Sequence, residues 1–337
     1  MARTIDDLRQ MQALPLSLKV SLTKARIRQW VNEYGENGVY VSFSGGKDST
    51  VLLHLVREMY PDIPAVFFDT GLEYPEIRDF VKTFDNVEAL KPKMNFKKVI
   101  EKYGYPFISK PISKAVSEAR HKAPTAIQRF EGDGKYAGGK YDYSKWHFLT
   151  DPDAPRFSSR CCDVMKKGPA HEYDRQTDRH PFTAEMAAES MLRTQNWLVN
   201  GCNMFGTKHP KSAPMSFWTE QDVLQYIREN NIEICSVYGE IVADEVKSEN
   251  VEGQLQIDID GNITETQCVL KTTGCDRTGC MFCGYGCHLN NDKRFVQMKQ
   301  THPKQYEWIM KPWEEGGLDY KRVIDWLNEH GNLHIKY

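Results

Sequence analysis

Residues 39–50 read Val-Tyr-Val-Ser-Phe-Ser-Gly-Gly-Lys-Asp-Ser-Thr, and the expected architecture follows from them. The first five residues are mostly apolar and favour a short buried strand. Two glycines follow, which let the backbone approach a ligand closely. The apolar run 51–60 then predicts a buried helix that Pro61 stops. A strand, a glycine-rich turn and a helix in this order are typical of a phosphate-binding site.

The polar residues of this loop suit an anion. The free N–H groups and the dipole at the start of a helix favour negative charge, and Lys47 adds an ammonium group. Hydroxyl donors come from Ser44, Ser49 and Thr50. The spacing is not that of a Walker loop, because Val41 and Asp48 stand where that motif has a glycine and a serine or threonine.

Strands alternate with helices around the loop. Apolar runs predict further strands at 65–68 and 87–90 and helices at 74–84 and 96–103. This alternation predicts an α/β fold, a Rossmann-like parallel sheet with helices on both faces. Ligands bind such sheets at the carboxyl ends of the strands, where the glycine-rich loop and the turn 69–71 both fall.

The rest of the chain divides into segments around this core. We expect an N-terminal helical segment at 1–36 and a nucleotide-binding domain at 37–240. Residues 118–150, rich in glycine, lysine and aromatic residues, are expected to form a long loop or insertion. The segment 241–337 is expected to hold a hairpin at 254–266, a Cys-rich stretch and a helical tail.

Composition narrows the class of protein. The 337 residues are 40% hydrophobic and 27% charged, with a net charge of −2, so any basic site must be local. No apolar run approaches the roughly 20 residues that span a bilayer, and the N-terminus lacks an apolar signal core. We expect a cytoplasmic protein that does not enter a membrane. Nine cysteines without an export signal argue against a disulfide framework.

The glycine-rich loop resembles the PP-loop, the Ser-Gly-Gly-x-Asp-Ser signature of the ATP pyrophosphatase (adenine nucleotide alpha hydrolase) superfamily. The match covers residues 44–49. The resemblance implies that ATP with Mg²⁺ binds at Ser44, Gly45, Gly46, Lys47, Ser49 and Thr50. It also implies chemistry at the α-phosphate, with Lys47, Asp48 and Ser49 as the catalytic residues.

Several further stretches, between about residues 38 and 290, resemble the phosphoadenylyl-sulfate (PAPS) reductase family. They are Phe67 to Pro75, Arg160-Cys161-Cys162, Ala187 to Arg193, Pro214 to Val223, and Arg277 to Cys283. The resemblance implies that Asp69, Thr70 and Gly71 line an adenosine pocket. It also implies that Glu189 and Arg193 lie near the phosphates, although Ala187 stands where the family often has arginine.

The cysteines suggest a metal centre, because thiolates are soft ligands that suit iron–sulfur clusters or zinc. The resemblance implies a four-iron four-sulfur cluster on Cys161, Cys162, Cys280 and Cys283, as in adenylyl-sulfate reductases. A local zinc site on Cys275, Cys280, Cys283 and Cys287 is the alternative, and a chain without metal is the third reading. The isolated Cys202, Cys235 and Cys268 are expected in the core.

The function expected from these features is adenylylation of an acceptor by ATP, with pyrophosphate release, coupled to sulfur transfer. The sequence does not choose between a nucleic acid and a small sulfur compound as the acceptor. It also allows a sulfur-donor protein as a partner and assembly into a homo-oligomer. One rival is a true sulfonucleotide reductase. Reductases that use thioredoxin carry a nucleophilic cysteine in a C-terminal tail, whereas this chain has none after Cys287. The other rival is a nucleotide-sensing or nucleic-acid-binding module without turnover.

Overall fold

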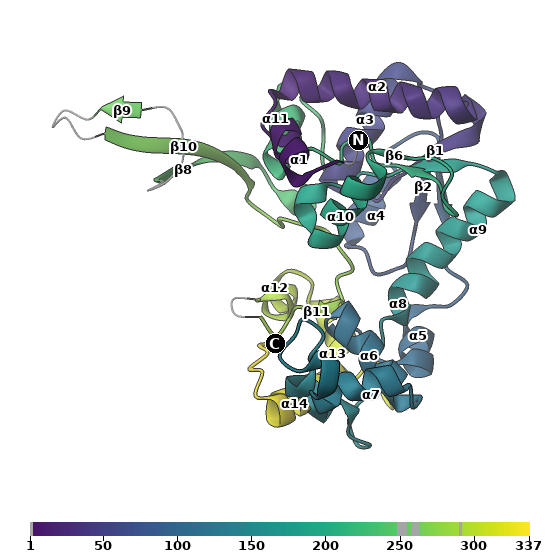
Figure 1. The fold of residues 1–337 in the computed structure, drawn as a ribbon, viewed down its shortest axis with the longest axis vertical. Coiled ribbons are helices and arrows are strands. Elements are labelled where there is room, and N and C mark those ends of the chain that lie inside the picture. The colour runs from purple at the N-terminus through teal and green to yellow at the C-terminus, as the bar shows by residue number, and fades with distance from the viewer. Residues whose placement is uncertain (1–2, 248–254, 258–262, 290–291) are drawn as a thin grey trace. The chain divides into compact units, whose positions relative to one another are not determined.

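A computed structural model describes residues 3–247, 255–257, 263–289 and 292–337 (Figure 1). The chain forms two compact units. Unit 1 comprises Met1–Asp69, Glu73–Leu90 and Ala170–Thr278, and unit 2 comprises Thr70–Leu72, Lys91–Pro169 and Gly279–Tyr337. This division differs from the contiguous segments expected from sequence, since the chain leaves unit 1 after residue 90 and returns to it at residue 170.

Unit 1 is built on a six-stranded sheet with the order β3-β2-β1-β5-β7-β6. The strands are β1 Val39–Ser42, β2 Ala65–Phe68, β3 Val87–Leu90, β5 His180–Phe182, β6 Asn203–Met204 and β7 Lys211–Ser212. Every neighbouring pair is parallel except β6 with β7. Because β2 and β5 lie on opposite sides of β1, the strand order reverses there, and such a switch point is where open α/β sheets bind ligands.

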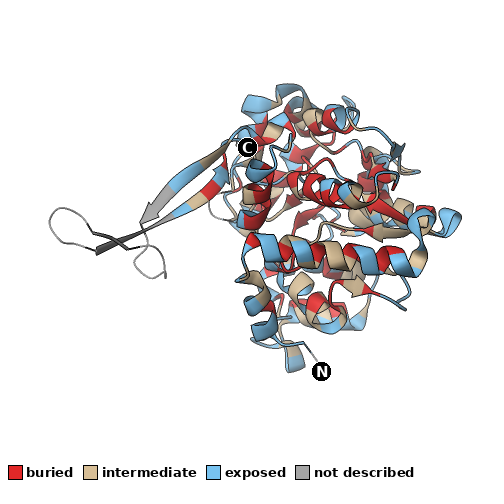
Figure 2. Ribbon diagram, turned by 90° about the horizontal axis from the view of Figure 1, so that it is seen from above, coloured by how far each residue is buried: buried red, intermediate tan, exposed pale blue. Residues whose placement is uncertain are grey.

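Helices cover both faces of this sheet, as the sequence predicts. Val39 and Val41 of β1 belong to a core with α2 (Leu16–Tyr34), α3 (Lys47–Met59) and α11 (Glu220–Glu229). The intervening Tyr40 points to the other face, where it packs on Tyr173 of α9 (Gly168–Thr177) and its hydroxyl donates to Asp174 at 2.7 Å. Buried residues accordingly line the inner sides of the helices in Figure 2. The period of two along β1 explains why neighbouring residues reach opposite layers.

The N-terminal helices are part of unit 1. Helix α1 (Ile5–Gln12) precedes α2, and a buried ion pair ties α2 to α11, with Lys19 Nζ at 2.7 Å from the Asp222 carboxylate. Asp222 also completes a capping box with Thr219, as its position three residues after that N-cap predicts. The indole of Trp218 donates to Thr23 Oγ1 at 2.9 Å. The helical segment is therefore fixed to the core by polar contacts as well as by packing.

Other elements of unit 1 agree with the sequence in kind and differ in length. Helix α3 begins at Lys47, four residues earlier than the apolar run suggests, and α4 (Pro75–Val81) is shorter than the expected 74–84. The expected hairpin is present as β9 (Leu255–Ile257) paired antiparallel with β10 (Ile263–Thr272), and β10 also pairs with β8 (Ile241–Lys247). Residues 258–262, between β9 and β10, lie outside the described residues.

Unit 2 is mainly helical. Its helices include α5 Phe96–Tyr103, α6 Lys110–Arg120, α7 Pro124–Glu131, α12 Arg294–Thr301, α13 Pro303–Met310 and α14 Tyr320–Gly331. Strands β4 (Phe107–Ile108) and β11 (Gly284–Tyr285) pair in parallel. No helix in the described ranges is long and apolar enough to cross a membrane.

The expectation of a long loop at 118–150 is wrong. The segment contains α7 and a 3-10 helix at Ser144–Thr150. Phe130 and Trp146 are buried in unit 2 and belong to its core, whereas Tyr141 of the same segment is exposed. The expected burial of Cys202 and Cys235 is confirmed, but Cys268 is exposed on β10.

Candidate functional site

The glycine-rich loop follows β1 directly and requires glycine at its first bend. Gly45 has a φ of 71°, a left-handed conformation that side chains disfavour. A Cβ at this position would lie 2.7 Å from Val81 Cγ2 and 2.9 Å from Ile77 Cγ2 of α4. The close approach of the loop to α4 therefore depends on the absence of a side chain.

The hydroxyl groups of the loop bond to the loop itself. Ser49 Oγ donates to the Gly46 carbonyl at 2.9 Å, and Thr50 Oγ1 donates to the same carbonyl at 3.1 Å. Ser44 Oγ lies 3.0 Å from Ser49 Oγ. Gly46 is the N-cap of α3 and supplies no side-chain cap. These hydroxyls hold the start of α3 in place, and the helix end relies on backbone donors.

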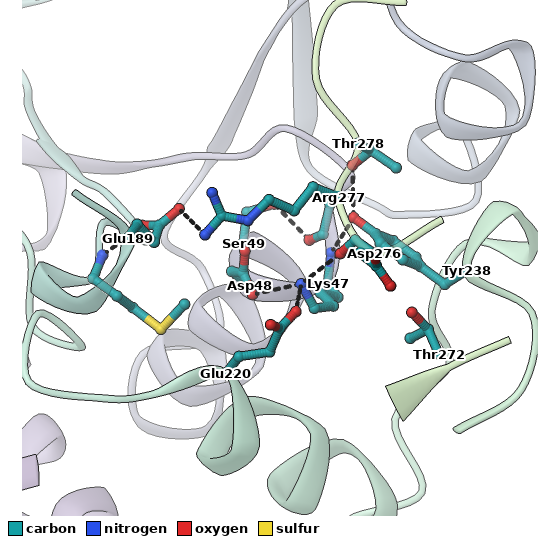
Figure 3. Close-up of polar contacts among 12 residues, drawn as sticks. Lys47, Asp48, Ser49, Glu189, Glu220, Tyr238, Thr272, Asp276, Arg277 and Thr278 are labelled. Atoms are coloured by element: carbon teal, nitrogen blue, oxygen red, sulfur yellow. Dashed lines mark hydrogen bonds and ion pairs between the residues drawn. The ribbon is translucent and has the colours of Figure 1, made fainter. Parts of the chain in front are cut away.

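Lys47 is buried, with 2% of its surface exposed, and its ammonium group is already paired. Nζ lies 3.0 Å from Glu220 Oε1 and 3.5 Å from Asp48 Oδ1, and it donates to the Asp276 carbonyl at 3.1 Å (Figure 3). Burial by itself lowers the pKa of Lys47, but the charges of Asp48 and Glu220 outweigh it, so the pKa is raised. Lys47 is therefore held charged next to two carboxylates.

Asp48 is the least satisfied polar group of the site. Its Oδ1 is buried and lies in the ion pair with Lys47, but it accepts no hydrogen bond within the described part of the chain. Burial raises the pKa of Asp48, and the attraction of Lys47 offsets only part of that effect. A buried carboxylate oxygen without a hydrogen bond is costly, and the Lys47 ammonium offsets part of that cost.

Tyr238 and Thr278 cover the loop, and sequence reasoning missed both. The Lys47 amide donates to Tyr238 Oη at 3.1 Å, and Tyr238 Oη shares a hydrogen bond of 2.6 Å with Thr278 Oγ1. A Cβ on Gly46 would lie 3.2 Å from each of these two oxygens. Thr278 and Asp276 lie just before Cys280, where the cysteines are the evident sequence signal, whereas Tyr238 carries no sequence signal.

Arg277 connects Glu189 to the region of the loop, and the sequence analysis gave this residue no role of its own. Glu189 pairs with Arg193 and lies 3.4 Å from Arg277 (Figure 3). The charge of Arg277 also acts on the pKa of Asp48, so this guanidinium is close to both carboxylates. Arg277 is 59% exposed in its side chain. It therefore provides an accessible cation beside the loop.

The predicted adenosine residues divide between the two units. Asp69, at the end of β2, accepts from Arg78 at 3.0 Å in unit 1. Thr70 belongs to unit 2, where its hydroxyl accepts from the Leu72 amide at 3.2 Å, and Gly71 adopts a φ of 73° with open space around it. Since β1 and β2 are parallel neighbours, Asp69 follows the same edge of the sheet as the glycine-rich loop.

Four cysteines of unit 2 line one small cavity of about 30 Å³. Cys161 and Cys162 come from the short helix α8 (Arg160–Cys162), and Cys280 and Cys283 come from the segment before β11. The remaining wall is largely apolar and includes Leu72, Phe96, Pro106 and Met165. The set predicted for the cluster is thus brought together within a single unit.

The backbone around these cysteines is fixed by hydrogen bonds within unit 2. The Met281 amide donates to the Leu72 carbonyl at 2.8 Å, and Arg294 donates to the Cys283 carbonyl at 2.6 Å. Of the alternative ligands, Cys287 is buried but does not line the cavity, and Cys275 belongs to unit 1.

The thiols interact strongly with one another. The hydrogen bond between the adjacent cysteines lowers the pKa of Cys162 to about 6, with help from the Lys110 ammonium, and raises that of Cys161. Throughout the described ranges, no three His, Cys, Asp or Glu side chains are grouped closely enough to hold one metal ion. Four thiols around one cavity are soft ligands of the kind that both iron–sulfur clusters and zinc use.

Comparison with known proteins agrees with this architecture. The sequence model of the phosphoadenosine phosphosulfate reductase domain matches residues 38–285. Adenosine 5'-phosphosulfate reductase of Staphylococcus epidermidis is 25% identical over 206 residues, which cover 61% of this chain and 67% of the relative. Sulfate adenylyltransferase subunit 2 of Shewanella frigidimarina is 25% identical over 240 residues, 70% of this chain and 68% of the relative.

A crystal structure of phosphoadenylyl-sulfate (PAPS) reductase from Candida auris, in complex with phosphate, matches 70% of this chain and 91% of its own, with 12% identity and a TM-score of 0.37. That score is too low for a comparison of sites. The domain match covers most of the chain, including the glycine-rich loop and all four cysteines of the cavity. The chain therefore belongs to the phosphoadenosine phosphosulfate reductase domain family.

Proposed function

We propose that this chain binds ATP with Mg²⁺ at the glycine-rich loop and catalyses attack on the α-phosphate. The main support for this proposal is the position of the loop. The loop follows β1, where the strand order reverses, and leads into helix α3. In the reaction, an acceptor nucleophile forms a bond to the α-phosphorus. The bond from that phosphorus to the α,β-bridging oxygen breaks, and pyrophosphate leaves with the electron pair.

Each loop residue has a role in this proposal. The amides of Gly45 and Gly46 and the ammonium of Lys47 stabilise negative charge on the phosphates. Ser49 and Thr50 act by fixing the Gly46 carbonyl, to which both hydroxyls donate. Ser44 supports the same turn through Ser49. Asp48 holds Lys47 charged, and its Oδ1, which accepts no hydrogen bond, would also take part in binding the magnesium ion.

The charge around Lys47 supports binding of nucleotide together with Mg²⁺ rather than alone. Asp48 and Glu220 lie beside the ammonium group, and Glu189 is linked to the same site through Arg277. These carboxylates would repel free triphosphate, whereas a divalent cation on the phosphates offsets that repulsion. Lys47 would exchange Glu220 for a phosphate oxygen on binding. Nucleotide affinity should therefore fall sharply in a chelator.

The remaining predicted residues complete the nucleotide site in this proposal. Asp69, Thr70 and Gly71 receive the adenosine, and Glu189 orients Arg193 and Arg277 toward the phosphates. The similarity to sulfate adenylyltransferase subunit 2 supports chemistry of this kind, because that relative is named for transfer of an adenylyl group to sulfate. The acceptor in this chain is a nucleic acid or a small sulfur compound, and a sulfur-donor protein would supply the sulfur.

We also propose that Cys161, Cys162, Cys280 and Cys283 hold a four-iron four-sulfur cluster. The shared apolar cavity and the low pKa of Cys162 support thiolate ligation. Such a cluster would supply electron transfer or a fixed local charge. The protein's own contribution is to bring two separate chain segments together, with Arg294 holding the Cys283 carbonyl.

Pyrophosphate release from ATP, measured with candidate acceptors and Mg²⁺, tests the proposal. Lys47→Ala should abolish release because the buried ammonium is lost, while Lys24→Ala, which removes a more exposed lysine of unit 1, should leave it unchanged. Full activity in Lys47→Ala would refute the loop assignment. Binding of ATP without pyrophosphate release under any acceptor would instead favour a nucleotide-sensing module.

A sulfonucleotide reductase is the second candidate, favoured by the similarity to adenosine 5'-phosphosulfate reductase. An assay of sulfite release from adenylyl sulfate and phosphoadenylyl sulfate, with thioredoxin or a small thiol as reductant, separates the two functions. Sulfite release at the rate of a working reductase, without pyrophosphate release from ATP, would replace the adenylylation proposal. The absence of sulfite with both substrates would remove the reductase.

A further inference from the structure

Unit 2 contains a cleft of about 640 Å³, and of the residues in its wall only Arg160 and Cys162 belong to the sequence motifs. It is formed by α6, by residues around α7 and the following 3-10 helix, and by the segment that leads into α8. Five cations face two carboxylates in its wall. The cations are Lys110, Lys114, Arg129, Arg160 and Lys167, and the carboxylates are Glu118 and Asp163. The cleft is therefore strongly positive in a chain whose net charge is −2.

Two of these cations have no carboxylate partner in the described part of unit 2. Arg129 packs its guanidinium over the rings of Tyr141 and Tyr136, at 5.2 and 5.4 Å from the ring centroids, and its buried Nε makes no hydrogen bond. Lys110 acts on the thiols of Cys162 and Cys283. A buried guanidinium nitrogen without an acceptor indicates a site for an anionic oxygen.

The two carboxylates of the cleft do not fully neutralise its other three cations. Glu118 lies 3.6 Å from Lys114, and Asp163 is shared between Lys167 at 3.1 Å and Arg160 at 3.7 Å. Helix α6 begins in the wall, at Lys110, and its N-terminal dipole adds to the positive potential. Arginine and lysine donors beside a helix start suit the oxygens of a phosphate group.

Aromatic rings in the same wall limit the class of phosphate-bearing ligand that the cleft would bind. Tyr141 is 49% exposed, with Arg129 and Lys140 at 5.2 and 5.8 Å from its ring centroid, whereas Tyr143 is buried. An exposed ring next to cations is the arrangement that stacks a nucleobase while its phosphate is neutralised. The volume also falls in the range of sites for small organic ligands, roughly 300–1,000 Å³.

We propose that this cleft is a second nucleotide-binding site, separate from the glycine-rich loop, which takes a nucleotide phosphate on Lys110 and Arg129 and stacks its base on Tyr141. All of its residues belong to unit 2, so the site does not depend on the proposed reaction at Lys47. Cys162 lines both the cleft and the cysteine cavity, which places a bound phosphate next to the cysteine set.

Calorimetry on the full chain tests the proposal, with thymidine monophosphate and a thymidine decanucleotide as probes because neither carries adenine. We expect saturable binding that weakens with salt. Lys110→Gln and Arg129→Gln should each raise the dissociation constant about tenfold or more, since each removes a charged hydrogen bond. The control is Lys122→Gln, which should have no effect. Lys122 is an exposed lysine just after the end of α6, the helix that begins at Lys110, and it lies outside the cleft.

A matched pair of variants tests the stacking of the base on Tyr141. Tyr141→Ala should weaken binding about fivefold or more, and Tyr141→Phe should restore it because the ring is kept. Tighter binding of the decanucleotide than of the monophosphate identifies a nucleic acid strand as the natural source, and equal binding identifies a free nucleotide. Lys47→Ala should bind both probes as the parent does.

Three results would overturn the proposal. The first is no saturable binding of either probe. The second is equal binding by Lys110→Gln and Lys122→Gln, with both variants folded by circular dichroism, which keeps the test valid should Arg129→Gln fail to fold. The third is loss of binding in Lys47→Ala, which would place the probes in the glycine-rich loop instead.

Discussion

The backbone amide of Lys47 donates a hydrogen bond of 3.1 Å to the hydroxyl of Tyr238. This amide belongs to the first turn of α3, where free N–H groups normally attract a phosphate. Tyr238 is buried and is held there by Thr278. A side chain of the protein therefore occupies a donor that the proposed nucleotide would use, and the nucleotide must compete with it.

Removal of the Tyr238 hydroxyl should have two opposite effects. Tyr238→Phe leaves the buried Lys47 amide without a partner, which should lower the free energy of unfolding by about 1–3 kcal/mol. The same amide becomes free for phosphate, so ATP should bind about two- to tenfold tighter. Urea denaturation and calorimetry measure the two effects. Tyr226→Phe, which removes a hydroxyl bonded to His54 instead, is the control, and equal ATP affinity in both variants would contradict the competition.

Two glycines with similar backbone angles should respond differently to alanine. Gly45→Ala places a methyl group 2.7 Å from Val81 Cγ2, in addition to the strain of a positive φ, and should destabilise the chain by about 2–5 kcal/mol. Gly71→Ala meets nothing within 4 Å and should cost about 1–2 kcal/mol. Thermal melting measures the difference. Equal costs would show that the loop can move away from α4.

The buried ion pair between Lys19 and Asp222 should matter far more than a surface pair. Lys19→Ala leaves a buried carboxylate without its cation, which should cost about 3–5 kcal/mol in urea denaturation. Lys24→Ala breaks a more exposed pair with Glu58 and should cost less than about 1 kcal/mol. A small loss in Lys19→Ala would mean that water reaches Asp222 and solvates it.

Anaerobic purification should separate the two kinds of cysteine. Cys162→Ser and Cys280→Ser should lose iron and acid-labile sulfide, because a serine oxygen replaces a thiolate ligand. Cys235→Ser, a buried cysteine of unit 1, should keep both. Parent protein that carries zinc and no iron would disprove the cluster.

His288 should make unit 2 sensitive to acid. Burial lowers the pKa of His288 below 6.5, the Lys145 charge lowers it further, and Nδ1 has no hydrogen-bond partner in the described residues. Below pH 6.5 the unfolded chain binds a proton that the folded chain does not, so stability is lost as the pH falls through this range.

The urea midpoint should therefore drop between about pH 7.5 and about pH 5.5 by more in the parent than in His288→Gln. Lys145→Gln should raise the pKa of His288 in an NMR titration, since it removes the nearby positive charge. Identical pH profiles of the parent and His288→Gln would rule out this histidine as the source of the acid sensitivity.

Local sequence patterns predicted some strands and one helix with the correct bounds. Residues 65–68, 87–90 and 96–103 form the expected strands and helix with the same bounds. The segment 118–150 was misjudged because its glycines and lysines suggested a loop. Phe130 and Trp146 are buried there by packing within unit 2, and the residues next to them in the sequence do not reveal that packing.

The sequence by itself determined the glycine-rich loop after the first strand and the alternation of strands and helices, and its resemblance to a family indicated which four cysteines belong together. These are local signals, because a turn, a helix start or a Cys-x-x-Cys spacing is written in consecutive residues. Tertiary structure alone decided what surrounds Lys47. Tyr238 and Asp276 reach it from 191 and 229 residues along the chain. Such contacts depend on the path of the backbone, and local residue patterns do not encode that path.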